Sequence, residues 1–231
     1  MAAFAPQGSR TTFARIAGAL YALVIVIGIA SVGRIEAFVA SGGDAAATVR
    51  AVAENATQIR WALVGELSMY AMVVALAVAL FVLLREADRN LALLAMTWRL
   101  AEAIVGAVLA IVATALPLHL AATSDGGAVR DALVPLLIEA NPIGRDVVLL
   151  FMGLGAMLFF VLFWRSKLVP RVLAGLGLLT YGSMIVLTVV SLLVPGLSED
   201  AKLWVYAPGG IFELVFGVWL VVRGVRDPRR A

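Results

Sequence analysis

The sequence contains no cysteine and a single histidine, His119, among its 231 residues. The lack of cysteine excludes disulfides, thiolate metal ligands, iron–sulfur clusters and a cysteine nucleophile. One histidine is too few for a multi-histidine metal site or a bis-histidine haem. Walker, HExxH and GxSxG motifs are also missing. These absences predict a protein without a metal or cofactor, and they argue against hydrolysis by metal, serine–histidine or cysteine chemistry.

Charged residues are also scarce, at 14% of the sequence, whereas 63% of residues are hydrophobic and the mean hydropathy is +1.03. A soluble domain is about a quarter charged and about half apolar. A helix of ~20 apolar residues is long enough to cross the hydrocarbon core of a bilayer. We therefore predict an all-α polytopic membrane protein that forms one domain over residues 1–231. Its six spans are predicted at Phe13–Val32, Trp61–Leu84, Leu91–Leu120, Val147–Phe163, Val172–Val194 and Leu203–Val222.

The distribution of basic residues predicts the orientation in the membrane. If the N-terminus is inside, eleven of the eighteen basic residues lie in inner segments, six lie in outer segments and Arg99 lies within a span. Short basic loops stay in the cytoplasm, so both termini are predicted to be cytoplasmic. The basic tail with Arg229 and Arg230 then needs only anionic membrane lipid as a partner, and we expect no nucleic acid. Lys167 and Lys202 are predicted in loops, which leaves no lysine for a retinal Schiff base inside the bundle.

Two outer loops have amphipathic patterns. Residues 44–60 and 129–140 space apolar residues at helical intervals among charges, and Asn141-Pro142 breaks the second segment. This pattern predicts two short amphipathic helices on the outer surface. They either seal the bundle or form a lid over an outward-facing cavity. Asp146, at the start of the fourth span, is interpreted as favourable helix N-terminal chemistry without a further function.

Four ionisable residues lie within the predicted spans: Glu66, Arg99, Glu102 and Glu213. Each costs ~2.5–3.5 kcal/mol in hydrocarbon on insertion scales unless it is paired, protonated or wetted. We therefore expect these side chains to face the bundle interior and one another. Helical rise counted from the span ends places Arg99 and Glu213 near the midplane, which predicts a direct pair. Glu66 and Glu102 are predicted to form a second layer above, with Tyr70 hydrogen-bonded to Glu66 from one turn away.

Small residues and a proline surround Glu213 in the sixth span. Gly209, Gly210 and Gly217 are predicted to share its face, where small residues let helices approach closely. Pro208, followed by two of these glycines, is predicted to interrupt the helix near its outer end. Such an interrupted helix is a common element of transporter binding sites.

Four segments spread over nearly the whole chain carry specific motifs: RIAGALYALVIVIGI (15–29), LREADRNLALLAMTWRLAEAI (84–104), LFFVLFWRSKLVPRVLAGLGLL (158–179) and FELVFGVWLVVRG (212–224). The most specific are Arg-Leu-x-Glu at 99–102, the RSKLVPR turn at 165–171 and the segment around Glu213. Together they resemble a bacterial family of six-transmembrane-helix proteins catalogued as a domain of unknown function. The resemblance implies six spans and a bacterial inner membrane, implies no particular activity, and singles out Arg99, Glu102 and Glu213.

Three functions remain open from the sequence. In the preferred one, Glu66, Tyr70, Arg99, Glu102 and Glu213 bind or transport a small or amphipathic solute, with or without proton linkage. A transporter of this size is expected to work as a homo-oligomer. In the second, the protein is an intramembrane enzyme that uses Glu66 or Glu213 as a general acid on a lipid or isoprenoid. In the third, it is a structural or regulatory membrane partner protein whose buried charges only specify helix packing.

Overall fold

The computed structural model describes residues 7–39, 44–123, 127–194, 197 and 199–226, and within them the chain is helical with no strand. The long helices are α1 (Gln7–Val39), α3 (Ala56–Leu84), α4 (Arg89–Ala110), α7 (Asn141–Ser166), α8 (Arg171–Leu193) and α9 (Glu199–Arg223). Within the described residues, six helical segments are long and apolar enough to cross a membrane. The predicted all-α, six-span fold is therefore confirmed, whereas the basic tail at Arg229 and Arg230 lies outside the described residues.

The contacts between the long helices form a closed ring in chain order. Each of α1, α3, α4, α7, α8 and α9 packs on the next, and α9 returns to α1. Close approach between α1 and α9 requires two glycines. A Cβ on Gly217 would lie 2.8 Å from the carbonyl oxygen of Gly18, closer than real Cβ contacts allow. Side chains that point into this ring therefore come from six helices at once.

Short sequence signals set the helix ends. Asp88 caps α4, because its side chain accepts a hydrogen bond of 3.0 Å from the Leu91 backbone N–H. Lys167 ends α7 in the left-handed conformation, with φ of 56°, and Pro170 precedes the first residue of α8. A π-helical turn, η1 (Ile111–Ala115), joins α4 to α5 (Leu116–Ala121) just before Pro117, whose ring and missing N–H disfavour a regular α-turn. The third span is thus one continuous helical segment of Arg89–Ala121.

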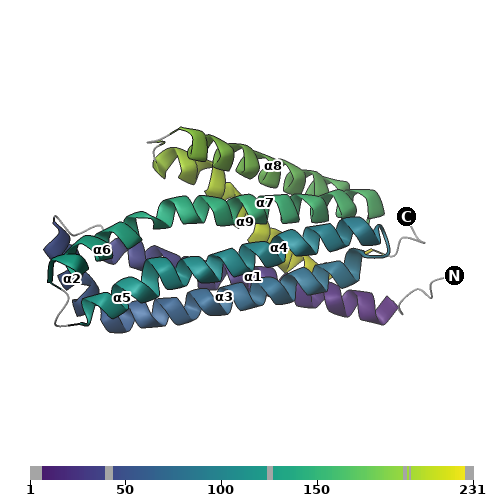
Figure 1. The fold of residues 1–231 in the computed structure, drawn as a ribbon. Helices are drawn as coiled ribbons and strands as arrows, with labels where there is room; N and C mark the ends of the chain where they lie inside the picture. The colour runs from purple at the N-terminus through teal and green to yellow at the C-terminus, as the bar shows by residue number, and fades with distance from the viewer. Residues whose placement is uncertain (1–6, 40–43, 124–126, 195–196, 198, 227–231) are drawn as a thin grey trace.

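Two short helices, α2 (Ala45–Glu54) and α6 (Gly127–Glu139), lie with α5 at one end of the ring, the cap end (Figure 1). Both termini lie at the opposite end, the termini end. The apolar faces of α2 and α6 meet α3 and α5 in a small core, made of Val49, Val52, Ile59, Leu118, Ala121 and Val134. The two amphipathic helices predicted from residues 44–60 and 129–140 are therefore present, and they pack on the bundle.

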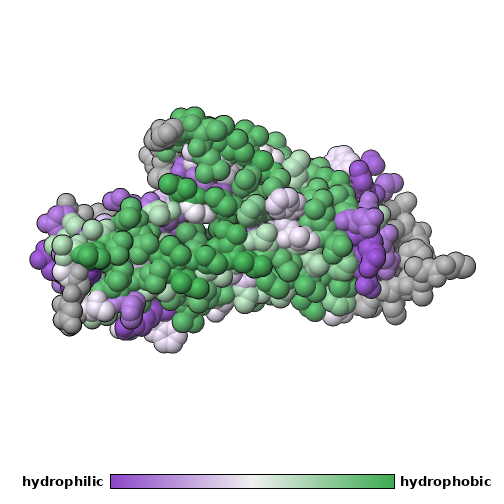
Figure 2. Space-filling view, viewed as in Figure 1, coloured by the Kyte–Doolittle hydropathy of each residue, from purple (hydrophilic) through white to green (hydrophobic). Residues whose placement is uncertain are grey.

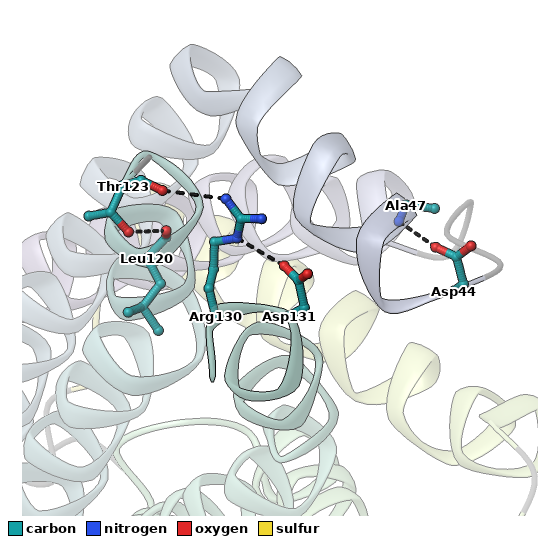
Figure 3. Close-up of polar contacts among 6 residues, drawn as sticks. All are labelled: Asp44, Ala47, Leu120, Thr123, Arg130 and Asp131. Atoms are coloured by element: carbon teal, nitrogen blue, oxygen red, sulfur yellow. Dashed lines mark hydrogen bonds and ion pairs between the residues drawn. The ribbon is translucent and has the colours of Figure 1, made fainter. Parts of the chain in front are cut away.

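Polar contacts hold this cap in place (Figure 3). The Ala47 backbone N–H donates to the Asp44 carboxylate at 2.6 Å, which caps α2. Arg130 donates to Asp131 at 2.9 Å and to the carbonyl oxygen of Thr123 at 3.4 Å, so α6 is tied to the residues that follow α5. The cap is a packed unit of the fold with its own N-cap and cross-links.

The surface between the two ends is hydrophobic. Figure 2 shows an apolar surface over the long helices, with hydrophilic residues gathered at both ends. Large apolar side chains on this surface are exposed on every long helix, including Val26, Val78, Val108, Leu179 and Val218. A water-soluble monomer rarely exposes such a patch. The chain is a multi-pass membrane protein.

Helix α9 differs from the prediction made for the sixth span. It is helical from Glu199 to Arg223 with Pro208 inside it, so the predicted interruption is wrong. Pro208 removes one backbone donor but leaves the neighbouring hydrogen bonds of the helix in place. Lys202, predicted in a loop, lies in the first turns of this helix, with a side chain only 12% exposed.

Candidate functional site in the ring interior

An ion pair on α4 lies at the middle of the ring interior. Arg99 Nη1 lies 2.7 Å from Glu102 Oε2, one turn along the same helix, and the two residues are 4% and 3% exposed. The angles between the groups are not those of a hydrogen bond, so both atoms lack a hydrogen-bond partner within the described residues. A buried polar group without a hydrogen bond costs free energy. The pair therefore retains hydrogen-bonding capacity that the protein does not use.

A glycine on α7 makes room for the arginine. A Cβ on Gly155 would lie 2.9 Å from Arg99 Cγ and 2.9 Å from the Ala95 carbonyl oxygen. The long apolar stem of Arg99 therefore passes across α7 at a place where only hydrogen fits. This contact explains why α4 and α7 can pack closely although one of them carries a buried arginine.

A second carboxylate, Glu213 on α9, faces the same space. The Tyr181 hydroxyl of α8 donates a hydrogen bond to Glu213 Oε1, and these residues are 0% and 6% exposed. Arg99 interacts electrostatically with Glu213 as well as with Tyr21 of α1 and Tyr181. We call Tyr21, Arg99, Glu102, Tyr181 and Glu213 the polar centre. It joins four of the six long helices around one arginine and two carboxylates.

The structure corrects three predicted contacts. Within the described residues, Arg99 pairs with Glu102 and makes no ion pair with Glu213, because its side chain turns along its own helix. Glu66 does not share a layer with Glu102; its electrostatic partner is Arg145, near the cap end of α7. Tyr70 makes no hydrogen bond to Glu66, since its ring packs against Gly106 of α4. All five predicted site residues are buried, as expected, but Glu66 and Tyr70 lie toward the cap end, outside the polar centre.

A second polar group, the cap-side cluster, joins α7, α8 and α9. Asp146 accepts a hydrogen bond of 2.6 Å from Ser191 and lies 3.7 Å from Lys202 Nζ. Tyr206 and Thr188 are hydrogen-bonded at 3.1 Å. Tyr206 lies two helical turns, ~10 Å, from Glu213. Sequence reasoning missed this cluster, because Asp146 has the residue type and position of an ordinary helix N-terminal acid.

Buried polarity is distributed unevenly along the bundle. Beyond the polar centre, the buried polar side chains of the described residues all lie toward the cap end: Ser31, Thr48, Glu66, Thr114, Asp146 and Thr188. Toward the termini end the interior is an aromatic plug of Phe160, Phe163 and Phe216, each 0% exposed. The ring centroid of Phe160 lies 4.9 Å from that of Phe216 and 5.4 Å from that of Tyr181. The polar centre is therefore sealed on one side and followed by polar groups on the other.

Replacing Tyr181 with phenylalanine is expected to destabilise the fold. The substitution leaves the buried Glu213 side chain without its hydrogen-bond donor, and a buried polar group left without a partner costs ~1–3 kcal/mol. Tyr206→Phe is the matched control, because it removes a hydroxyl bonded to the neutral Thr188. The measurement is the apparent melting temperature in lipid nanodiscs. Equal shifts for the two variants would contradict a stabilising hydrogen bond between Tyr181 and Glu213.

Comparison with known proteins places the chain in a family. The model of the family described as "Domain of unknown function (DUF4386)" matches residues 16–224. The match covers α3, α4, α7, α8 and α9 in full, α1 from residue 16 onward, and every residue of the polar centre. No curated protein and no solved structure matches the chain. The resemblance inferred from the sequence motifs is confirmed, and it adds no activity to the chemistry of the site.

Proposed function

The chain belongs to the DUF4386 family of membrane proteins, and from its polar centre we propose that it binds a small or amphipathic solute inside the ring. The observation that carries the proposal is the buried Arg99–Glu102 pair, in which Nη1 and Oε2 have no hydrogen-bond partner. A solute with an acceptor oxygen, such as a carboxylate, amide or hydroxyl, satisfies the guanidinium. Apolar and aromatic surroundings favour an amphipathic solute over a fully polar one.

The geometry of the ion pair argues against a purely structural role. Arg99 and Glu102 lie on one helix, so their attraction does not hold two helices together. An ion pair kept for packing specificity is expected between helices, as coiled-coil registry charges are. The polar contact between helices is instead the hydrogen bond from Tyr181 of α8 to Glu213 of α9.

The general-acid alternative has less support. In the polar centre Glu213 is a hydrogen-bond acceptor for Tyr181. A general acid must carry a proton and direct it toward the substrate. Glu66, the other candidate acid, is buried toward the cap end with Arg145 as its electrostatic partner, outside the polar centre. Binding is thus the function that these carboxylates fit better.

We propose that the solute enters from the cap end. Polar groups at Glu66, Asp146 and Thr188 provide hydrogen-bonding positions on that side, whereas the aromatic plug fills the other. The excess of basic residues at the termini end favours a cytoplasmic location for that end. The cap then faces away from the cytoplasm, across a bacterial inner membrane. A transport cycle in such a protein requires the plug to open in a second conformation.

Mass spectrometry of molecules that co-purify with the protein tests this proposal. Wild-type protein is expected to retain a specific small molecule or lipid that Glu213→Gln and Arg99→Lys lose while staying folded. Glu54→Gln is the matched control, because Glu54 is exposed on α2, away from the ring interior. Bulk lipid alone in the wild-type sample, or equal retention by all variants, would overturn the proposal. Size-exclusion profiles establish that each variant is folded.

A further inference from the structure

A separate cavity of about 240 Å³ lies at the termini end of the ring. It is lined by residues of α1, of the end of α3 and the turn after it, and of the end of α7 and the turn after it. They include Arg10, Leu83, Glu86, Arg165, Ser166 and Leu168. Arg10 begins the first apolar span, and α3 and α7 end at Leu84 and Ser166. The cavity therefore lies where three spans meet the interface between hydrocarbon and water.

The polar wall of this cavity contains two guanidinium groups and one carboxylate. Arg10 forms an ion pair with Glu86, so this guanidinium already holds an oxyanion that belongs to the chain. Arg165 is exposed at the cavity wall. The Ser166 hydroxyl donates to the Phe163 carbonyl oxygen at 3.4 Å, a long contact by the usual criteria. The wall carries net positive charge, and its two guanidinium groups are hydrogen-bond donors suited to an oxyanion.

The other wall is apolar and firmly held. Leu83 and Leu168 are only 3% and 4% exposed. The Arg226 backbone N–H donates to the Leu168 carbonyl oxygen at 2.8 Å, which fixes the RSKLVPR turn to the segment after α9. Gly224 permits this return of the chain, because it adopts a φ of 66° that disfavours other residues. A basic wall and an apolar wall thus meet at the membrane interface.

We propose that this cavity binds the phosphate of an anionic lipid head group. Arg10 and Arg165 hold the phosphate, since guanidinium groups bind phosphate oxygens in pairs of parallel hydrogen bonds. Leu83 and Leu168 contact the first carbons of the lipid. Glu86 competes with the phosphate for Arg10 and sets the affinity. This site is distinct from the polar centre and does not depend on the function proposed for it.

Removing a basic charge and removing an acidic charge from the cavity are expected to have opposite effects on lipid retention, and this difference tests the site. Native mass spectrometry would count phosphatidylglycerol retained by the full-length protein from nanodiscs of phosphatidylglycerol and phosphatidylcholine. Arg165→Gln is expected to weaken retention by about tenfold, because a charged hydrogen bond is lost. Glu86→Gln is expected to strengthen retention, which a general loss of folding cannot do. Arg89→Gln removes an exposed charge at the same end, outside the cavity, and is expected to have little effect.

Three results would overturn the proposal. Equal losses for Arg165→Gln and Arg89→Gln would mean that the lipid follows the basic surface in general. Displacement of phosphatidylglycerol by inorganic phosphate at equal concentration would assign the cavity to a free phosphate compound. Weaker retention by Glu86→Gln would contradict the competition between carboxylate and phosphate.

Discussion

Arg99→Ala is expected to cause the largest loss of stability of any single substitution in the ring interior. Removal of the guanidinium leaves Glu102, 3% exposed, without its counter-charge, and also leaves Glu213 without the nearest cation of the polar centre. Breaking a buried pair on one side costs ~3–5 kcal/mol, because the remaining charge stays desolvated. The measurement is the apparent melting temperature in nanodiscs at a single scan rate, since membrane proteins often unfold irreversibly.

The double variant Arg99→Met/Glu102→Leu separates folding from function. It removes both members of the pair, so no charge of the pair is left alone, and stability is expected to recover toward the wild type. Retention of the co-purifying solute is expected to stay lost, because the guanidinium that binds it is gone. A double variant no more stable than Arg99→Ala would mean that the two residues do not act as a pair. If the double variant regains both its stability and its retention of the solute, the binding role of Arg99 is contradicted.

Gly18→Ala and Gly217→Ala are expected to separate α1 from α9, the two helices whose contact closes the ring. A Cβ on Gly18 would lie 2.8 Å from Leu220 Cβ and 2.9 Å from the Val221 backbone nitrogen, so α1 and α9 must separate. Overpacking of this kind costs ~1–3 kcal/mol. The expected result is a lower yield of monodisperse protein after extraction and a lower melting temperature.

Gly210→Ala is the matched control for the ring closure. It makes the same change in the same helix as Gly217→Ala, but nothing lies within 4 Å of the added Cβ. Alanine is the better helix former by ~1 kcal/mol, so this variant is expected to be neutral or slightly more stable. Equal destabilisation by Gly210→Ala and Gly217→Ala would mean that the loss of glycine, and not the contact with Gly18, is responsible.

Much of the architecture follows from local sequence. Apolar runs of sufficient length predict six spans, and helical spacing in residues 44–60 and 129–140 predicts α2 and α6. The cost of charge in hydrocarbon predicts that Glu66, Arg99, Glu102 and Glu213 are buried. These predictions succeed because hydrophobic transfer and helical periodicity depend on each segment alone. They fail at Pro208, because neighbouring turns of α9 supply enough hydrogen bonds to carry the helix past one missing donor.

The partners of the buried groups were decided by the tertiary structure. Depth along a helix predicts that Arg99 and Glu213 lie near the same level, but not the direction in which a flexible arginine side chain turns. Gly155 on α7 decides that direction by leaving room for the stem, and Glu102 then lies within 2.7 Å. Likewise, Tyr181 meets Glu213 only when α8 packs on α9, and Asp146 meets its partners only when α7 lies beside both helices. The sequence by itself determined the membrane spans and which residues must be buried. Only the packing of the helices determined which buried side chains contact one another, because the rotation of each helix and the identity of its neighbours depend on contacts between segments distant in the sequence.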